Sequence, residues 1–364
     1  MAPNAGQMAA ETLASGYVGQ GPKVDEFELA FAHAVGLERM PLGVTSCTTA
    51  IDLALHLTGV GPGDEVVTSP MTCTATNGPI VTRGARPVWA DVDPLTGLID
   101  PADVARKIAS TTKAIIAVDW GGAPCDYREL KKAACGLPII QDAAHRLFPT
   151  NPGGDYVCWS FGPIKHLTCG GSGGALLPPA SQYDRARLLR WHGLDRLSKA
   201  DFRCEQDITE VGYRAHLTDD LATVGLANLG MARENVRKAQ ENAKFYTRVF
   251  AGAPGITVQP FDAASDYWLY TLLVEDRASF LAFLAERGVM ASPVHARNDT
   301  HTAFRRAAGE TTPLPGVDHF AARNVAIPCG WWLTSADREK VAAAVLTWGQ
   351  KQPINEEEEV YAYA

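Results

Sequence analysis

Residues 141–145 are QDAAH and residues 159–174 are WSFGPIKHLTCGGSGG, and these two stretches carry the most distinctive residues of the chain. The apolar run at residues 137–140 predicts a short buried strand. Asp142 follows that run directly, which would place its carboxylate at the carboxyl end of the strand. His145 comes three residues later.

Lys165 lies in the second stretch, between a phenylalanine and a glycine-rich run. A strand-end carboxylate and a lysine in such a turn suit pyridoxal phosphate. That cofactor needs a lysine for its Schiff base and an acid that keeps its pyridine nitrogen protonated. Strand-end aspartates and loop lysines are also common in purely structural roles, so the surrounding chain has to decide between the two interpretations.

The composition is that of a globular enzyme. The chain has 364 residues, 46% of them apolar and 20% charged, and a net charge of −8. This length predicts one large and one smaller domain. The negative charge argues against nucleic acid or an anionic membrane as the main partner, so a phosphate-bearing ligand would need a local site.

Targeting and metal-binding signals are weak in this sequence. It has no run of 18 apolar residues, and its start lacks the basic and apolar regions of a signal peptide. The eight cysteines form no CxxC pair, and the nine histidines are scattered. We therefore expect reduced, mostly buried cysteines in a cytoplasmic protein without a metal site.

Predicted strands and helices alternate through the first half of the chain. Strands are expected at 66–69, 86–92 and 113–120, and helices at 100–108 and 127–134. This alternation predicts a mostly parallel sheet with helices on both faces. Ligands bind such sheets at the carboxyl ends of the strands, where Asp142 is expected.

A helix N-terminus is predicted at Ser46 and the threonines after it, before the apolar run that starts at Ile51. Unpaired backbone N–H groups make such an end a natural phosphate site. Simple N-capping by serine or threonine is the alternative interpretation.

The domain organisation is predicted from breaks in these patterns. Residues 1–23 look like an N-terminal arm, extended where the glycines lie, and 24–252 form the large domain, ending in a long helix from 217 to 250. Residues 253–350 form a smaller α/β domain, and 351–364 are an acidic, unpatterned tail.

With these pieces in order, the chain resembles the nucleotide-sugar aminotransferase family of the DegT/DnrJ/StrS type, a branch of the fold-type-I pyridoxal phosphate transferases. The resemblance spans about residues 16–348. The matching motifs occur in the order GYVGQGPKVDEFE, TSCTTAIDLAL, GPGDEVVTSPMTCTATN, GARPVWADVDP, QDAAH, SFGPIKHLT, HGLD, GYR, VHARND and AIPCGWWLT.

The resemblance implies roles for particular residues. Lys165 matches the Schiff-base lysine, and Asp142 matches the carboxylate on the pyridine nitrogen. His145 takes the place of the residue that faces the phenolic oxygen of the cofactor. The residues matched to the cofactor phosphate are Ser160, Thr48 and Thr49. Weaker matches on the substrate side, for which surface or packing roles compete, are His192, His295, Arg297 and Asn298.

The chain also departs from the family pattern. Cys73 stands where the family often stacks an aromatic ring on the cofactor, and a thiol offers no π face. The stretch TCGGSGG lacks the acidic residue that the family has before its glycine pair, and Ser172 is the residue nearest to that position. This departure affects the expected orientation of the substrate more than that of the cofactor. Arg214 replaces an asparagine that reaches the phosphate of the neighbouring subunit, and Cys47 replaces a glycine.

The function that the resemblance implies is transfer of an amino group, with glutamate as the expected donor, to a ketone on a nucleotide-linked deoxysugar. The resemblance also implies a homodimer with shared active sites. Alternatives are an aminotransferase acting on a cyclitol or another small ketone, and a non-catalytic module that binds pyridoxal phosphate. A sugar dehydratase of the same fold is disfavoured by Lys165, because the related dehydratases have histidine there.

Overall fold

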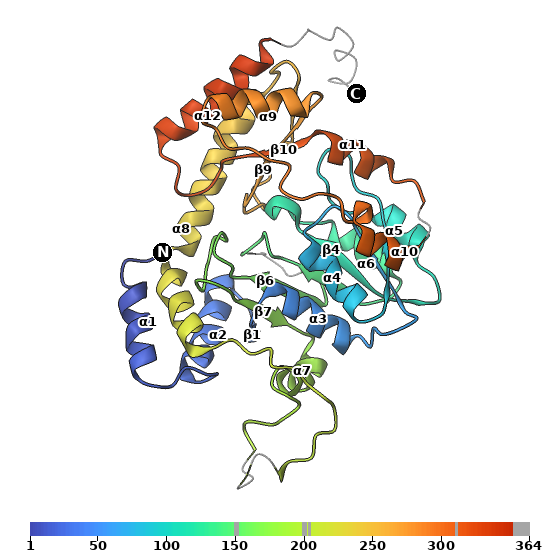
Figure 1. The fold of residues 1–364 in the computed structure, drawn as a ribbon, viewed down its shortest axis with the longest axis vertical. Helices are drawn as coiled ribbons and strands as arrows, with labels where there is room; N and C mark the ends of the chain where they lie inside the picture. The colour runs from blue at the N-terminus through green and yellow to red at the C-terminus, as the bar shows by residue number, and fades with distance from the viewer. Residues whose placement is uncertain (149–152, 199–201, 203–204, 310–311, 352–364) are drawn as a thin grey trace.

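A computed structural model describes residues 1–148, 153–198, 202, 205–309 and 312–351 (Figure 1). The strands are β1 Leu42–Val44, β2 Glu65–Thr68, β3 Arg86–Trp89, β4 Thr112–Val118, β5 Ile139–Asp142, β6 Tyr156–Ser160, β7 Gly174–Leu177, β8 Ile256–Val258, β9 Tyr270–Val274 and β10 Asn324–Ile327. The α-helices are α1 Ala5–Ala14, α2 Pro22–Val35, α3 Cys47–Leu57, α4 Thr74–Thr82, α5 Pro101–Lys107, α6 Tyr127–Ala134, α7 Tyr183–Leu189, α8 Asp219–Phe250, α9 Arg277–Glu286, α10 Thr302–Ala308, α11 Pro315–Arg323 and α12 Ser335–Gly349. No helix among these residues is long and apolar enough to cross a membrane.

Seven strands form the large sheet, in the order β1-β7-β6-β5-β4-β2-β3. The pairs from β6 through β5, β4 and β2 to β3 are parallel, while β7 runs antiparallel to both of its neighbours. The predicted mostly parallel sheet is confirmed. Because β4, β5 and β6 are parallel neighbours, their carboxyl ends meet at one edge of the sheet.

The two faces of this sheet are covered by different helices, because successive strand residues point to opposite sides. On one face Ile116, Ile140 and Leu176 pack against residues of α3 and α7. On the other face Val157 and Trp159 pack against α2 and α8. Residues of α5 and α6 cover β4 and β5 on a further part of the core. Almost every strand residue is buried, as a sheet between helix layers requires.

The smaller sheet is antiparallel, in the order β10-β9-β8. It packs against the end of α8 and against α9 and α12 in a separate core. Figure 1 shows α8 running from beside α1 and α2 to the layer of α9 and α12, so this helix connects the two sheets. The predicted division at residue 253 falls between the end of α8 and the start of β8, and it stays a prediction.

The N-terminal region differs from the extended arm that its glycines suggested. Residues Ala5–Ala14 form α1, which packs along α8. Thr12 explains part of this, because its buried hydroxyl bonds that of Thr223 on α8 at 2.9 Å. Within residues 1–23, the parts outside helix are residues 1–4 and the glycine-containing part between α1 and α2. The predicted acidic tail lies largely outside the described residues.

Candidate active site

Asp142 is the last residue of β5, at the carboxyl edge of the parallel sheet, and its side chain is buried. Its Oδ2 accepts a hydrogen bond of 2.7 Å from the hydroxyl of Thr76, and its Oδ1 accepts one of 3.0 Å from the Ala144 amide. The thiol of Cys47 lies 3.6 Å from Oδ1. Burial raises the pKa of Asp142, while the hydrogen bonds and the charge of Lys165 act in the opposite direction.

Lys165 lies on the loop between β6 and β7, and this loop is held against the start of α3. At Gly174 an added Cβ would lie 2.5 Å from the carbonyl carbon of Ser46 and 2.6 Å from the nitrogen of Cys47. Only glycine permits this approach. Ser172 adds a hydrogen bond from its hydroxyl to the Thr45 carbonyl. The glycine-rich run therefore brings Lys165 beside the N-terminus of α3.

The Lys165 amine has an unusual proton affinity for a lysine. Burial lowers its pKa to about 8, against the opposing effects of Asp142, Cys47 and Cys73. Near neutral pH a larger fraction of this amine is uncharged than in an ordinary lysine. An uncharged amine is what covalent capture of a carbonyl and proton abstraction both require.

His145 is held as a neutral imidazole. Burial is the main cause that lowers its pKa well below the usual value, and the charges of Lys165, His295 and His166 act in the same direction. The Gly121 amide donates to its Nδ1 at 3.3 Å. The ring proton is therefore assigned to Nε2, which can donate a hydrogen bond to an oxygen atom.

The N-terminus of α3 is capped by Ser46, whose Oγ accepts a hydrogen bond of 3.1 Å from the Thr49 amide. The predicted helix N-terminus is confirmed, and Ser46 caps it as the alternative interpretation expected. The Thr49 hydroxyl bonds the hydroxyls of Thr45 and Ser46. Thr48 lines a cavity of about 480 Å³ beside Thr49 and Arg214. A phosphate at this helix end stays a prediction, as does its contact with Ser160, the last residue of β6.

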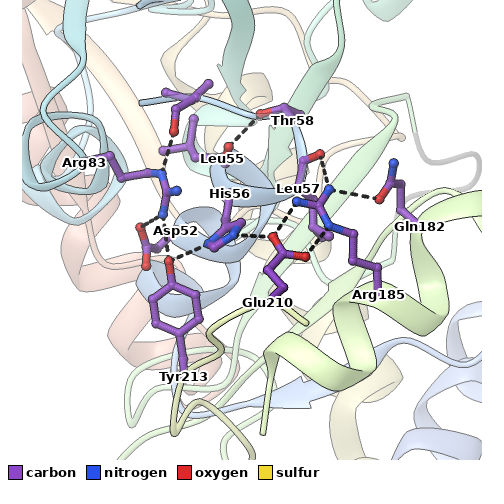
Figure 2. Close-up of polar contacts among 11 residues, drawn as sticks. Asp52, Leu55, His56, Leu57, Thr58, Arg83, Gln182, Arg185, Glu210 and Tyr213 are labelled. Atoms are coloured by element: carbon purple, nitrogen blue, oxygen red, sulfur yellow. Dashed lines mark hydrogen bonds and ion pairs between the residues drawn. The ribbon is translucent and has the colours of Figure 1, made fainter. Parts of the chain in front are cut away.

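Arg214 follows a segment that is anchored by a network of polar side chains (Figure 2). Glu210 accepts two hydrogen bonds from Arg185 of α7, at 2.8 and 2.7 Å, and contacts Nε2 of His56 at 2.7 Å. Tyr213 bonds Nδ1 of His56 and accepts from Arg83, both at 2.8 Å. The backbone before Arg214 is thus attached to α3, α4 and α7, while the Arg214 side chain is exposed.

The predicted substrate-side residues fall into two groups. His295 lies with Lys165 and His145, and its ring is parallel to that of His145 within 8° at 6.1 Å between centroids. His192 lines a different cavity of about 530 Å³, together with Arg214, Arg196 and His216. That cavity is lined by two arginines and two histidines without an acidic residue, which suits an anionic ligand.

Arg297 and Asn298 have partners within the protein. The Arg297 guanidinium pairs with the carboxylates of Asp299 and Asp318. Asn298 is fully buried; it donates to the Thr72 carbonyl at 2.8 Å and accepts from Asn77 at 3.0 Å. This geometry favours structural roles for both, linking the segment before α10 to the region around α4.

Two residues of the site, Thr76 and Trp268, were not predicted from the sequence. Thr76, on α4, donates to Asp142, and no motif singled it out. Trp268 precedes β9, and its ring lies 3.4 Å below the Lys165 Nζ and stacks on His145 at 4.0 Å between centroids. A tryptophan next to a mostly apolar predicted strand was the available signal. Cys73 supplies no ring to this site and occupies the N-cap position of α4.

Comparison with known proteins agrees with this geometry. Residues 2–346 match the DegT/DnrJ/EryC1/StrS aminotransferase family. The chain belongs to this family. It is 31% identical over 312 residues to the dTDP-4-dehydro-2,3,6-trideoxy-D-glucose 4-aminotransferase of Saccharopolyspora spinosa, covering 79% of this chain and 80% of that protein.

Solved structures of similar proteins share the fold. The sugar aminotransferase CalS13 from Micromonospora echinospora superimposes with a TM-score of 0.89 at 36% identity, covering 95% of this chain and 97% of CalS13. The putative sugar aminotransferase Spr1654 from Streptococcus pneumoniae, solved in a PMP-form, gives a TM-score of 0.88 at 25% identity, with 96% and 98% covered. The protein is therefore an aminotransferase with the fold-type-I architecture expected from its sequence.

Proposed function

We propose that this aminotransferase moves an amino group from an amino acid, expected to be glutamate, to a keto group on a nucleotide-linked deoxysugar. The observation that carries the proposal is that buried Asp142 and Lys165 lie close enough to influence each other's charge at the carboxyl edge of the sheet, in a member of this family. The similar proteins reported above are named as aminotransferases that act on sugars.

The residues fit pyridoxal phosphate. Asp142 is a buried carboxylate whose side-chain hydrogen-bond partners are a hydroxyl and a thiol. A protonated pyridine nitrogen would supply the positive charge that such a carboxylate lacks as a direct partner. Lys165 would hold the cofactor covalently, His145 would donate from Nε2 to its phenolic oxygen, and the N-terminus of α3 would receive its phosphate.

When bound, the cofactor supplies an electron sink that makes the α-proton of the donor removable. The remaining tasks fall to the protein. Asp142 would keep the ring nitrogen protonated, and the Lys165 amine would take the proton from the substrate carbon and hold it at Nζ for its return. The cavity around His192 and Arg196 offers a cationic group, the Arg196 guanidinium, to an anionic portion of the substrate.

The test of this function uses the two halves of the reaction separately. Glutamate should bleach the yellow chromophore of the purified holoenzyme, and a panel of keto-sugar nucleotides should then restore it. Restoration by a cyclitol ketone alone would support the alternative acceptor. A chromophore that glutamate leaves unchanged would support a non-catalytic binding module.

We also propose that the protein is a homodimer and that Arg214 reaches the cofactor phosphate of the partner subunit. The side chain is exposed on an anchored segment, and guanidinium geometry suits phosphate. Arg214→Ala should weaken cofactor retention, and the loss relative to wild type should be larger at low salt because salt screens an exposed charge. Dialysis with absorbance readings measures retention, and light scattering measures mass.

Mixing two impaired variants tests the sharing between subunits: Lys165→Ala, which is expected to be inactive, and Arg214→Ala, which is expected to retain the cofactor poorly. If Arg214 acts across the interface, a mixed dimer of Lys165→Ala and Arg214→Ala chains contains one intact site and regains activity. If Arg214 acts on its own chain, no site in the mixed dimer is intact. A monomeric, fully active protein would contradict both the homodimer and the contact of Arg214 with the partner subunit.

A further inference from the structure

The Lys165 amine and the Trp268 indole are in direct contact. Nζ lies 3.4 Å from the centroid of the ring, which is the arrangement of a cation–π interaction. The indole also stacks on the imidazole of His145, with 4.0 Å between ring centroids and an interplanar angle of 21°. One indole therefore contacts the amine and the imidazole that the proposed function uses.

The indole is held in place by its own N–H and by the backbone beside it. Nε1 donates to the Ile164 carbonyl at 2.9 Å, which ties the ring to the residue before Lys165. Tyr267 has a φ of 47°, a left-handed conformation that costs energy for a side chain of this size. Asp266 accepts hydrogen bonds from the Leu147 and Phe148 amides at 2.5 and 2.8 Å.

The same segment is attached to the turn that follows β4. The Asp266 amide donates to the Gly122 carbonyl, and the Leu269 amide donates to the Gly121 carbonyl. At Gly122, with a φ of 104°, an added Cβ would lie 2.9 Å from the Tyr267 nitrogen and 3.0 Å from the His145 carbonyl oxygen. A strained conformation fixed from several sides is the pattern of a positioned functional group.

We propose that the indole face of Trp268 is the docking surface for the protonated Lys165 amine, and that Trp268 is a positioning residue for the proton transfer. This rests on the proposed function. In that function the free, neutral Lys165 amine would take the proton that leaves the substrate carbon. The resulting ammonium would need a stabilising partner for as long as Nζ carries this proton.

A π face suits this task better than a carboxylate. The other charged or titratable groups that face Lys165 are Asp142, Cys47, Cys73, His145, His166 and His295. Asp142 is assigned to the ring nitrogen, and the three histidines are neutral or, if protonated, repel the ammonium. The indole attracts the cation without accepting its proton, so the proton stays available for the next step.

The experiment measures the titration of Lys165 in the full-length, cofactor-free chain. Competitive acetylation with acetic anhydride over a pH series, followed by peptide mass spectrometry, gives the midpoint for the Lys165 peptide. Trp268→Leu removes the π face, and the midpoint should fall by about 0.5 to 1 pH unit. Trp268→Phe keeps a π face, so its midpoint should stay between that of wild type and that of the leucine variant.

Trp332→Leu is the matched control, because Trp332 is 60% exposed and its ring contact is with Trp331. Its Lys165 midpoint should equal that of wild type. If Trp268→Leu fails to fold by circular dichroism, Trp268→Met replaces it. A wild-type midpoint in the folded leucine or methionine variant would overturn the proposal, as would a phenylalanine variant that matches leucine. Because this titration needs no substrate, its result is independent of whether a keto-sugar nucleotide is accepted.

Discussion

Lys165→Ala is expected to abolish amino transfer, with a loss of about 10⁴-fold or more in kcat. The substitution removes both the covalent attachment of the cofactor and the base that moves the proton. The buried amine with a pKa of about 8 is the group on which both roles depend. Lys165→Arg should be equally inactive, because a guanidinium stays protonated and cannot form the linkage.

The chemical identity of the attachment can be mapped directly. Borohydride reduction of the wild-type holoenzyme should remove the yellow chromophore and leave the cofactor fixed to the peptide that contains Lys165. Lys131→Ala, on the exposed surface of α6, is the matched control and should keep full activity. An adduct on another lysine, or no chromophore after reconstitution with pyridoxal phosphate, would contradict the assignment.

Asp142→Asn is expected to give the second-largest loss, about 10²- to 10³-fold in kcat, or about 3–4 kcal/mol. The neutral amide can still hydrogen-bond the pyridine nitrogen, but it no longer favours the positively charged form. Steady-state kinetics with glutamate measure the loss. Turnover close to wild type would show that Asp142 is a structural residue only.

The stability of the Asp142→Asn variant against urea distinguishes a catalytic role of Asp142 from a structural one. Burial raises the pKa of Asp142 in the folded chain, so its contribution to stability is greatest below the unfolded pKa and is lost as pH rises through the folded pKa. At pH 7 the cofactor-free Asp142→Asn variant should therefore unfold at no lower urea concentration than wild type. Asp119, the neighbouring buried carboxylate after β4, is bound by Tyr127, Gln141 and the Cys125 amide. Its carboxylate also lies 3.6 Å from the buried guanidinium of Arg146. Asp119→Asn should instead lose stability, because it leaves the buried Arg146 charge without this partner.

The sequence by itself determined the features that depend on local pattern. The apolar run before Asp142 predicted a strand that ends at a carboxylate, and β5 ends at that residue. The helix expected at 127–134 is α6, and the alternation of strands and helices predicted the parallel part of the sheet. Periodicity and capping act within a few residues, so they can be identified along the chain without knowing its path.

Only the tertiary structure decided which distant side chains complete the site. Thr76 reaches Asp142, Asn298 is buried against Thr72, and Trp268 contacts both Lys165 and His145. The helix α1 likewise formed where the composition suggested an extended arm, because α8 offers it a packing surface. These contacts depend on strand order and on the close backbone approaches at glycines such as Gly122. Neither leaves a periodic signal in the sequence, because the partners lie on elements that only folding brings together.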